Sequence, residues 1–200
     1  MTTRIQRDFS FLSGVYCENN FSMCLYDFSL QVDVETDSIR EQNIAMERIS
    51  FFISEYLNNC IFVNETNKKM IDTYSSAGFK VCTLPEEPHD QIISLMLMLK
   101  LNAITEGRFV ITDLSLASNL GDGVSYICDI DGPTGPFAKE GWWSKSDASI
   151  SSPTKLNKKE KIVQLFKTHT CDWSEFGLGW KEKEISLSVS PEISFDKLPE

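Results

Sequence analysis

The chain has 200 residues, of which 42% are hydrophobic and 24% are charged, and its formal net charge is −10. This length and composition are typical of one globular domain that buries about 70% of its unfolded surface, and they exclude a disordered chain. The negative charge disfavours binding to nucleic-acid phosphates, which requires clustered lysine and arginine, and adsorption to anionic membranes. It favours solubility and complementarity to a basic partner surface.

The cysteines and the first residues indicate the compartment. The six cysteines form no C-x-x-C pair, and the N-terminal residues lack the apolar run of a secretion signal. Both observations favour a reducing setting, so we expect a cytoplasmic protein.

The first third of the chain predicts a strand followed by a helix. Apolar and polar residues alternate in 28–34, as in a half-buried strand, and residues 21–27 either extend it or form the other arm of a hairpin. Ser38 and Glu41 have the spacing of a capping box, and apolar residues recur at helical spacing from there to Leu57. The charged residues expected to face solvent on this helix are Arg40, Glu47 and Arg48.

Short strands and helices alternate in the middle of the chain. Strands are expected over 60–63 and 79–84, with a helix over 67–77 between them. Residues 92–104 are apolar almost all round, but the run falls short of the ~20 residues that cross a bilayer. We therefore expect a core helix there, covered on several sides.

A hairpin follows the core helix. Residues 108–117 and 124–130 read as its two strands, because turn-forming residues lie between them. Beyond it we expect a surface loop, a lysine-rich amphipathic helix and a late strand, over 131–153, 156–168 and 185–189.

This order of elements predicts the α/β class, with a mixed β-sheet packed with about four helices; an α+β arrangement is the alternative. We expect a single α/β domain over residues 1–181, followed by a C-terminal strand and frayed tail over 182–200.

An apolar strand that ends in D-x-D-G is the sharpest catalytic motif. Asp129 and Asp131 occupy its aspartate positions, and Pro133 separates the motif from Thr134. The segment resembles the nucleophile loop of haloacid-dehalogenase-type phosphatases. That resemblance implies that Asp129 attacks phosphorus, that Asp131 acts as acid and base, and that both help to hold magnesium. The alternative is a strand end with an aspartate-rich turn.

Carboxylates around the hairpin are the candidate metal ligands. The predicted hairpin brings Asp129 near Asp113, and paired carboxylates bind hard cations. Asp122 and Asp131 lie close in sequence, but the spacing is not that of an EF-hand. Turn aspartates that bond the local backbone are the competing interpretation.

Histidine and cysteine offer little further chemistry. His89 lies in the first turn of the core helix beside Asp90, where an imidazole can serve as a base, and His169 lies two residues from Cys171. The chain contains no nucleophile elbow, phosphate-binding loop, dinucleotide fingerprint or H-E-x-x-H zinc motif. No catalytic set is complete.

All four tryptophans lie in the C-terminal half of the chain, near glycines. Indoles on such loops can anchor a protein interface, or they can cover the hydrophobic core where regular secondary structure ends. The candidate binding residues are Trp142, Trp143, Trp173 and Trp180.

Several segments within residues 20–145 resemble small accessory proteins of T4-like tailed bacteriophages. They are EEPHDQ at Glu86–Gln91, KLNAITEGR at Lys100–Arg108, LGDGVSY at Leu120–Tyr126 and GWW at Gly141–Trp143. The resemblance implies a non-virion protein of the infected host cytoplasm that acts by binding a host factor, and it carries no catalytic residue.

The first hypothesis is therefore a non-enzymatic, acidic protein-binding module without a cofactor, whose partner is a host or phage protein and not nucleic acid or a membrane. The alternative is a small phosphate-directed hydrolase that uses Asp129 and Asp131 with magnesium.

Overall fold

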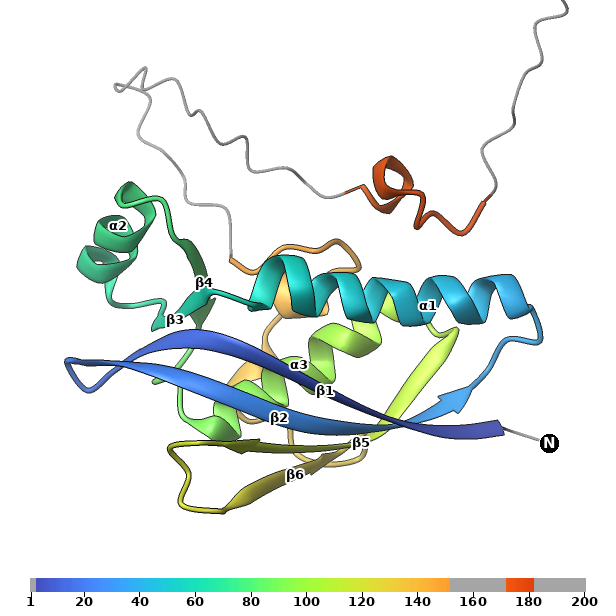
Figure 1. Ribbon diagram of the computed structural model, residues 1–200, viewed down its shortest axis with the longest axis horizontal. Coiled ribbons are helices and arrows are strands. Elements are labelled where there is room, and N and C mark those ends of the chain that lie inside the picture. The colour runs from blue at the N-terminus through green and yellow to red at the C-terminus, as the bar shows by residue number, and fades with distance from the viewer. Residues whose placement is uncertain (1–2, 152–171, 182–200) are drawn as a thin grey trace, which may run out of the picture.

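The computed structural model describes residues 3–151 and 172–181 (Figure 1). Six strands form one mixed sheet in the order β4-β3-β1-β2-β5-β6. β3 pairs in parallel with β1 and β4, and the other neighbours are antiparallel. The strands are β1 (Thr3–Cys17), β2 (Asn20–Val34), β3 (Cys60–Asn64), β4 (Lys80–Leu84), β5 (Phe109–Ser118) and β6 (Ser125–Asp129).

Three α-helices accompany this sheet within the described residues: α1 (Ile39–Phe51), α2 (Lys68–Ser76) and α3 (Asp90–Thr105). The fold class is as expected, with a mixed sheet and packed helices, but the count is three and not about four. The helix expected over 156–168 and the strand expected over 185–189 lie outside the described residues.

The helix ends follow from local chemistry. The Ser38 hydroxyl accepts from the Glu41 amide (3.4 Å), and Asn67 caps α2 by accepting from the Met70 amide (3.3 Å). α1 continues without a break into a π-helical stretch, Phe52–Leu57. The helix expected from Ser38 to Leu57 is confirmed, since its cap and its apolar face both agree with the sequence pattern.

The long β1–β2 hairpin contains the main departure from the sequence expectations. Residues 21–27 belong to the same strand as 28–34, and their partner is β1, a strand that the sequence pattern did not predict. Glu18 and Asn19 form the two-residue turn with φ of 50° and 66°, the backbone that tight hairpins require. The β1 pattern is weak because polar residues, among them Ser13, stand at inward positions.

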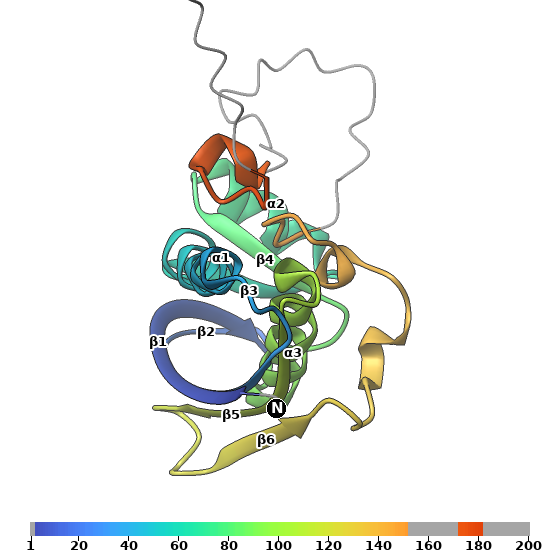
Figure 2. The same cartoon turned by 90° about the vertical axis from the view of Figure 1, so that its right-hand side faces the viewer.

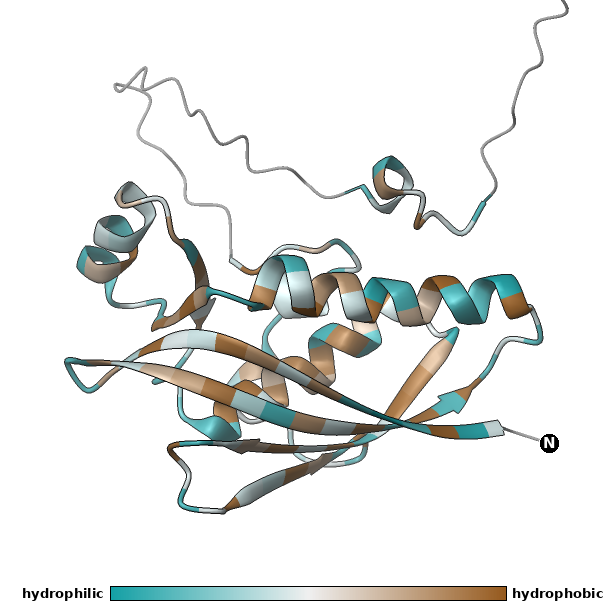
Figure 3. Ribbon diagram, in the orientation of Figure 1, coloured by the Kyte–Doolittle hydropathy of each residue, from teal (hydrophilic) through white to brown (hydrophobic). Residues whose placement is uncertain are grey.

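α3 is the centre of the core. It packs against β5, β6 and α1, and Ile93, Met96 and Leu101 are fully buried on it. Figure 3 shows apolar residues along most of α3, whereas α1 alternates between polar and apolar positions. The core helix expected over 92–104 is confirmed. Within the described ranges, no helix has both the length and the apolar character needed to cross a membrane.

The two faces of the sheet are covered differently. α1 and α3 lie on the inner face (Figure 2), while α2 packs on the opposite face of β3 and β4 through a small separate cluster around Ile61 and Val63. α2 also covers the turn end of the β1–β2 hairpin on that face, where Tyr74 packs against Tyr16 and Phe21, and no described helix covers the rest of the outer face of β1, β2, β5 and β6.

The segment expected as a surface loop over 131–153 is in part a core element. It contains two 3-10 turns, Gly135–Ala138 and Trp142–Ser144, and it buries Phe137 and Ala148. Aromatic burial without periodicity explains the error, because irregular backbone can carry core side chains that no sequence repeat reveals.

Candidate functional site

The outer face of β1, β2, β5 and β6 is the candidate site, and we call it the open face. Strand register defines its members, because side chains of directly paired residues point to the same side of a sheet. Leu30 and Leu114 pair and point into the core, so their sequence neighbours point outward. β6 continues the same pattern, since Asp129 pairs with Asp113 and Ser125 with Ala117.

The open face is acidic. Its single cation, Arg4, is already bound to Asp33 by two hydrogen bonds of 2.6 and 3.0 Å. The hydrogen bond from the guanidinium lowers the pKa of the Asp33 carboxyl. The carboxylates on this face are Asp8, Asp27, Asp33, Asp113 and Asp129. One cation therefore shares this face with five carboxylates, and its charge acts on Asp113 as well as on Asp33.

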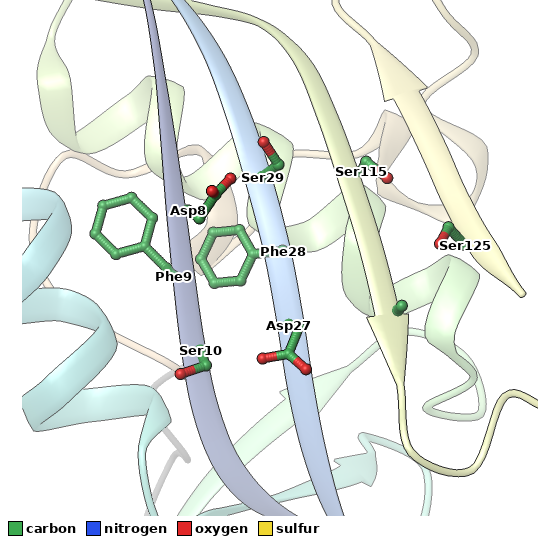
Figure 4. Close-up of a pocket in the computed structure, with 9 residues that line it drawn as sticks. Asp8, Phe9, Ser10, Asp27, Phe28, Ser29, Ser115 and Ser125 are labelled. Carbon is green, nitrogen blue, oxygen red and sulfur yellow. The ribbon is translucent and has the colours of Figure 1, made fainter. Parts of the chain in front are cut away.

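A hollow of about 420 Å³ lies in the middle of the open face (Figure 4). It forms because short side chains meet there: Ser29 pairs with Ser115, and Ala117 pairs with Ser125. Asp8 and Asp27 stand beside it on β1 and β2. Its volume falls within the range of small-molecule pockets, but its aspartates are exposed, so it is a depression in a surface and not an enclosed cavity.

Apolar residues continue the open face toward the turn of the β1–β2 hairpin. Leu12 and Leu25 pair directly across the strands and are 39% and 43% exposed. Phe21 and Met23 lie beyond them at 48% and 49% exposure. A cluster of exposed large apolar side chains next to charged ones is typical of a surface that contacts another protein.

The aspartates of the proposed metal site are only partly brought together. The hairpin places Asp113 directly opposite Asp129, whereas Asp131 lies in the turn that follows β6. Across the described part of the chain, no three acidic, histidine or cysteine side chains gather as metal ligands. Asp122 lies in the β5–β6 turn with φ of 47°. Magnesium binding therefore stays a prediction that rests on the Asp113–Asp129 pair.

Three of the four tryptophans lie in the core. Trp142, Trp143 and Trp173 are 1–5% exposed, and their indole nitrogens donate to main-chain oxygens of Thr83, Lys139 and Ser146. Trp180 is partly buried between the guanidinium groups of Arg48 and Arg108. An indole that is almost fully buried offers little area to a partner. Our proposed contact surface is therefore the open face and not the tryptophan loops.

His89, the histidine within the described residues, lies near Cys17. Cys17 Sγ is 3.8 Å from His89 Nδ1, an arrangement that sequence spacing did not indicate. Burial, assisted by the nearby Glu87 carboxylate, raises the pKa of the Cys17 thiol to about 11. Because the reactive form of cysteine is the thiolate, this pair lacks the activation of a cysteine hydrolase. His169 and Cys171 lie outside the described residues.

Sequence reasoning missed Asp8, Asp27 and the serines around the hollow. Their common signal is a period of two along paired strands, with short polar residues on one side. That signal was visible on β2, where Ser29 and Gln31 alternate with apolar residues, but no pattern showed that β1 and β5 are its neighbours.

Comparisons with known proteins identify only distant structural similarity. No protein-family model and no curated protein matches the sequence. An uncharacterized protein from Wolinella succinogenes aligns with 66% of this chain and 99% of its own, at 8% identity and a TM-score of 0.47. A 6-pyruvoyl tetrahydropterin synthase from Plasmodium vivax aligns with 64% and 97%, at 9% identity and a TM-score of 0.40. Neither similarity is close enough to assign a family or a function.

Proposed function

We propose that this protein is a non-enzymatic binding module that engages a basic surface of another protein through its open face. The observation that carries the proposal is the excess of aspartates over cations on the part of the sheet face that no described helix covers. Complementary charge of this kind speeds association and orients the partner. The resemblance to accessory proteins of T4-like phages supports a host or phage protein in the host cytoplasm as the partner.

The apolar end of the open face distinguishes a binding surface from a merely solvated one. Carboxylates alone would serve solubility, but Leu12, Leu25 and Met23 gain nothing from contact with water. A partner that covers both parts would bury the apolar end and pair its own cations with the aspartates. This combination of apolar contacts and a charged rim is usual in transient interfaces.

Neutralising the acidic part should weaken the complex tenfold or more, since each lost charge pair contributes to association and orientation. The partner is captured from host or infected cells with the full-length protein, identified by mass spectrometry, purified and titrated by calorimetry. The wild-type affinity should fall steeply with salt, and that of the neutralised variant should fall less. The variant carries asparagine at Asp8, Asp27, Asp113 and Asp129.

A matched control separates the face from the overall charge. It neutralises four exposed carboxylates on other surfaces: Glu47, Asp72, Glu86 and Glu140. This control should bind within about threefold of the wild type, because screened charges far from an interface contribute little. Equal weakening in both variants would contradict the proposal. So would a magnesium-dependent hydrolysis of phosphate esters that Asp129→Asn abolishes, which is the result that the hydrolase alternative predicts.

A further inference from the structure

β6 is an edge strand, and within the described part of the chain no other strand uses its outer hydrogen-bonding groups. The Ile130 amide donates to Thr112, so the alternation of an antiparallel ladder places Ser125, Ile127 and Asp129 with their N–H and C=O groups pointing away from β5. No described strand lies beyond β6 in the sheet, as Figure 2 shows. The Asp129 carbonyl accepts one local bond, from Gly132 (3.1 Å), and can accept a second.

The sheet protects its other edge but not this one. β4 begins with Lys80, and the Thr83 amide donates to Ile150 of the loop that runs past it (3.1 Å). β6 has neither lysine nor proline, and its pairing with β5 shows no bulge. Lysine, proline and bulges are among the devices that stop an edge strand from pairing with another chain, and the one charged residue of this five-residue strand is Asp129 at its end.

The centre of β6 is also apolar. Ile127 is 75% exposed on the open face, the highest exposure of any large hydrophobic side chain in the described residues. Two antiparallel copies of β6 related by a two-fold axis at this residue would place one Ile127 beside the other. The two Ile127 side chains would then contact each other, and this contact would bury apolar surface of both.

Electrostatics selects this register among the two-fold arrangements. With the axis at Ile127, each Ser125 hydroxyl lies opposite the carboxylate of Asp129 of the partner subunit, to which it can donate. A shift of the axis toward Asp129 brings the two carboxylates closer together, and like charges in direct opposition destabilise a strand pair. A shift toward Ser125 leaves the amide of Asp129 without a partner.

We propose that a second copy of this chain pairs with the β6 edge, antiparallel and centred on Ile127. The two sheets become one continuous sheet, and the two open faces join into a single acidic surface. A five-residue strand pair is at the small end of specific interfaces, so we expect a reversible dimer with a dissociation constant on the order of 10 µM. The proposal does not depend on any basic partner, since it rests on the backbone and side chains of β6.

Analytical ultracentrifugation of the full chain, from about 1 to 300 µM, tests the proposal. The average mass should rise from 22.7 kDa toward twice that value. Ile127→Lys should weaken the dimer at least 30-fold, because it places two ammonium groups together at the axis. The matched control is Leu120→Lys, which adds the same charge at a 54% exposed residue of the neighbouring turn and should dimerise as the wild type does.

A second pair of variants tests the register. Ser125→Glu sets a carboxylate opposite Asp129 of the partner subunit and should weaken the dimer about tenfold, whereas Ser125→Lys should bind at least as tightly as the wild type. The pairing is overturned by a wild-type mass that stays at 22.7 kDa throughout, or by equal effects of Ile127→Lys and Leu120→Lys. Equal effects of the two Ser125 variants overturn the register. All of these results are independent of whether a basic partner binds.

Discussion

Replacement of Lys100 by methionine should lower the free energy of unfolding by about 3 kcal/mol near neutral pH. The Lys100 ammonium is completely buried in α3 and donates to the main-chain oxygens of Trp142 (2.9 Å) and Lys145 (2.8 Å). Asp147 Oδ1 lies 3.6 Å away. Methionine fills a similar volume but cannot donate, so the loop from Trp142 to Asp147 loses the donor that fixes it to the core. Chemical denaturation followed by circular dichroism measures the difference.

The pH dependence of the same variant gives a sharper result. Burial lowers the pKa of Lys100 from 10.5 to about 8, although Asp147 partly opposes the shift. Below pH 8 the amine is charged in both states, so the folded protein bears the full cost of a buried charge. Between pH 8 and 10.5 the Lys100 amine is protonated to a greater extent in the unfolded chain than in the folded protein. The contribution of Lys100 to the free energy of unfolding therefore rises with pH. The advantage of the wild type over Lys100→Met should grow by about 2 kcal/mol from about pH 7.5 to 9.5.

Lys145→Met is the control, because Lys145 is an exposed lysine of the same loop. It should change stability by no more than about 0.5 kcal/mol and leave the pH profile unaltered. Buried thiols such as Cys82, whose pKa is raised, also titrate at alkaline pH. Because these thiols are present in every variant, the difference in stability between wild type and Lys100→Met isolates the contribution of Lys100. A pH-independent difference between wild type and Lys100→Met would show that the amine is hydrated in the folded state.

The elements that the sequence predicted correctly are those whose ends and buried side are determined by a local residue pattern. The α1 helix has a cap at Ser38 and an apolar stripe, so local sequence determined both its start and its inner face. The β5–β6 hairpin was equally readable, and its pairing of Asp113 with Asp129 follows from the position of the turn. In both cases the residues that define the element lie within one short segment of the sequence.

The unpredicted part depends on contacts between distant residues. β1 shows little alternation, and its place in the sheet is fixed by pairing with β2 on one side and β3 on the other. The open face exists because α2 packs over β3, β4 and the turn end of the β1–β2 hairpin and leaves the rest of the other strands uncovered. The tryptophans show the same limit, because sequence alone cannot distinguish an exposed indole from one that covers the core.

Arg48 is the residue whose placement differs most from the sequence expectation. A charged residue on the polar side of α1 was expected to face solvent, yet it is only 2% exposed. Its guanidinium donates to the carbonyls of Leu178 (2.9 Å) and Ile104 (3.0 Å) and to the Glu106 carboxylate (2.8 Å). The indoles of Trp173 and Trp180 lie 4.9 and 3.8 Å from it, measured from Cζ to each ring centroid. Arg48 thus joins the segment 172–181 to the body of the fold.

Replacement of Arg48 by methionine should lower the free energy of unfolding by about 4 kcal/mol, because the carbonyls and the Glu106 carboxylate lose a buried donor and the indoles lose a stacked cation. Arg48→Lys keeps the charge but not the planar fork, and it should lose about half as much. Arg4→Met, which breaks the exposed pair with Asp33, is the control and should cost no more than about 1 kcal/mol.

The Arg48→Met substitution should also allow residues 172–181 to detach from the body of the fold before the rest of the protein unfolds. Arg40 holds the Trp180 carbonyl (2.5 Å) and Ser146 holds the Trp173 indole (2.6 Å), but neither interaction replaces the three acceptors that Arg48 serves. Hydrogen exchange in residues 172–181 should therefore accelerate in Arg48→Met while exchange in α3 stays slow, and tryptophan emission should shift to longer wavelength as Trp173 and Trp180 enter water. If exchange instead accelerates equally in both regions, the segment belongs to the cooperative core, and Arg48 stabilises the whole fold and not one docked segment.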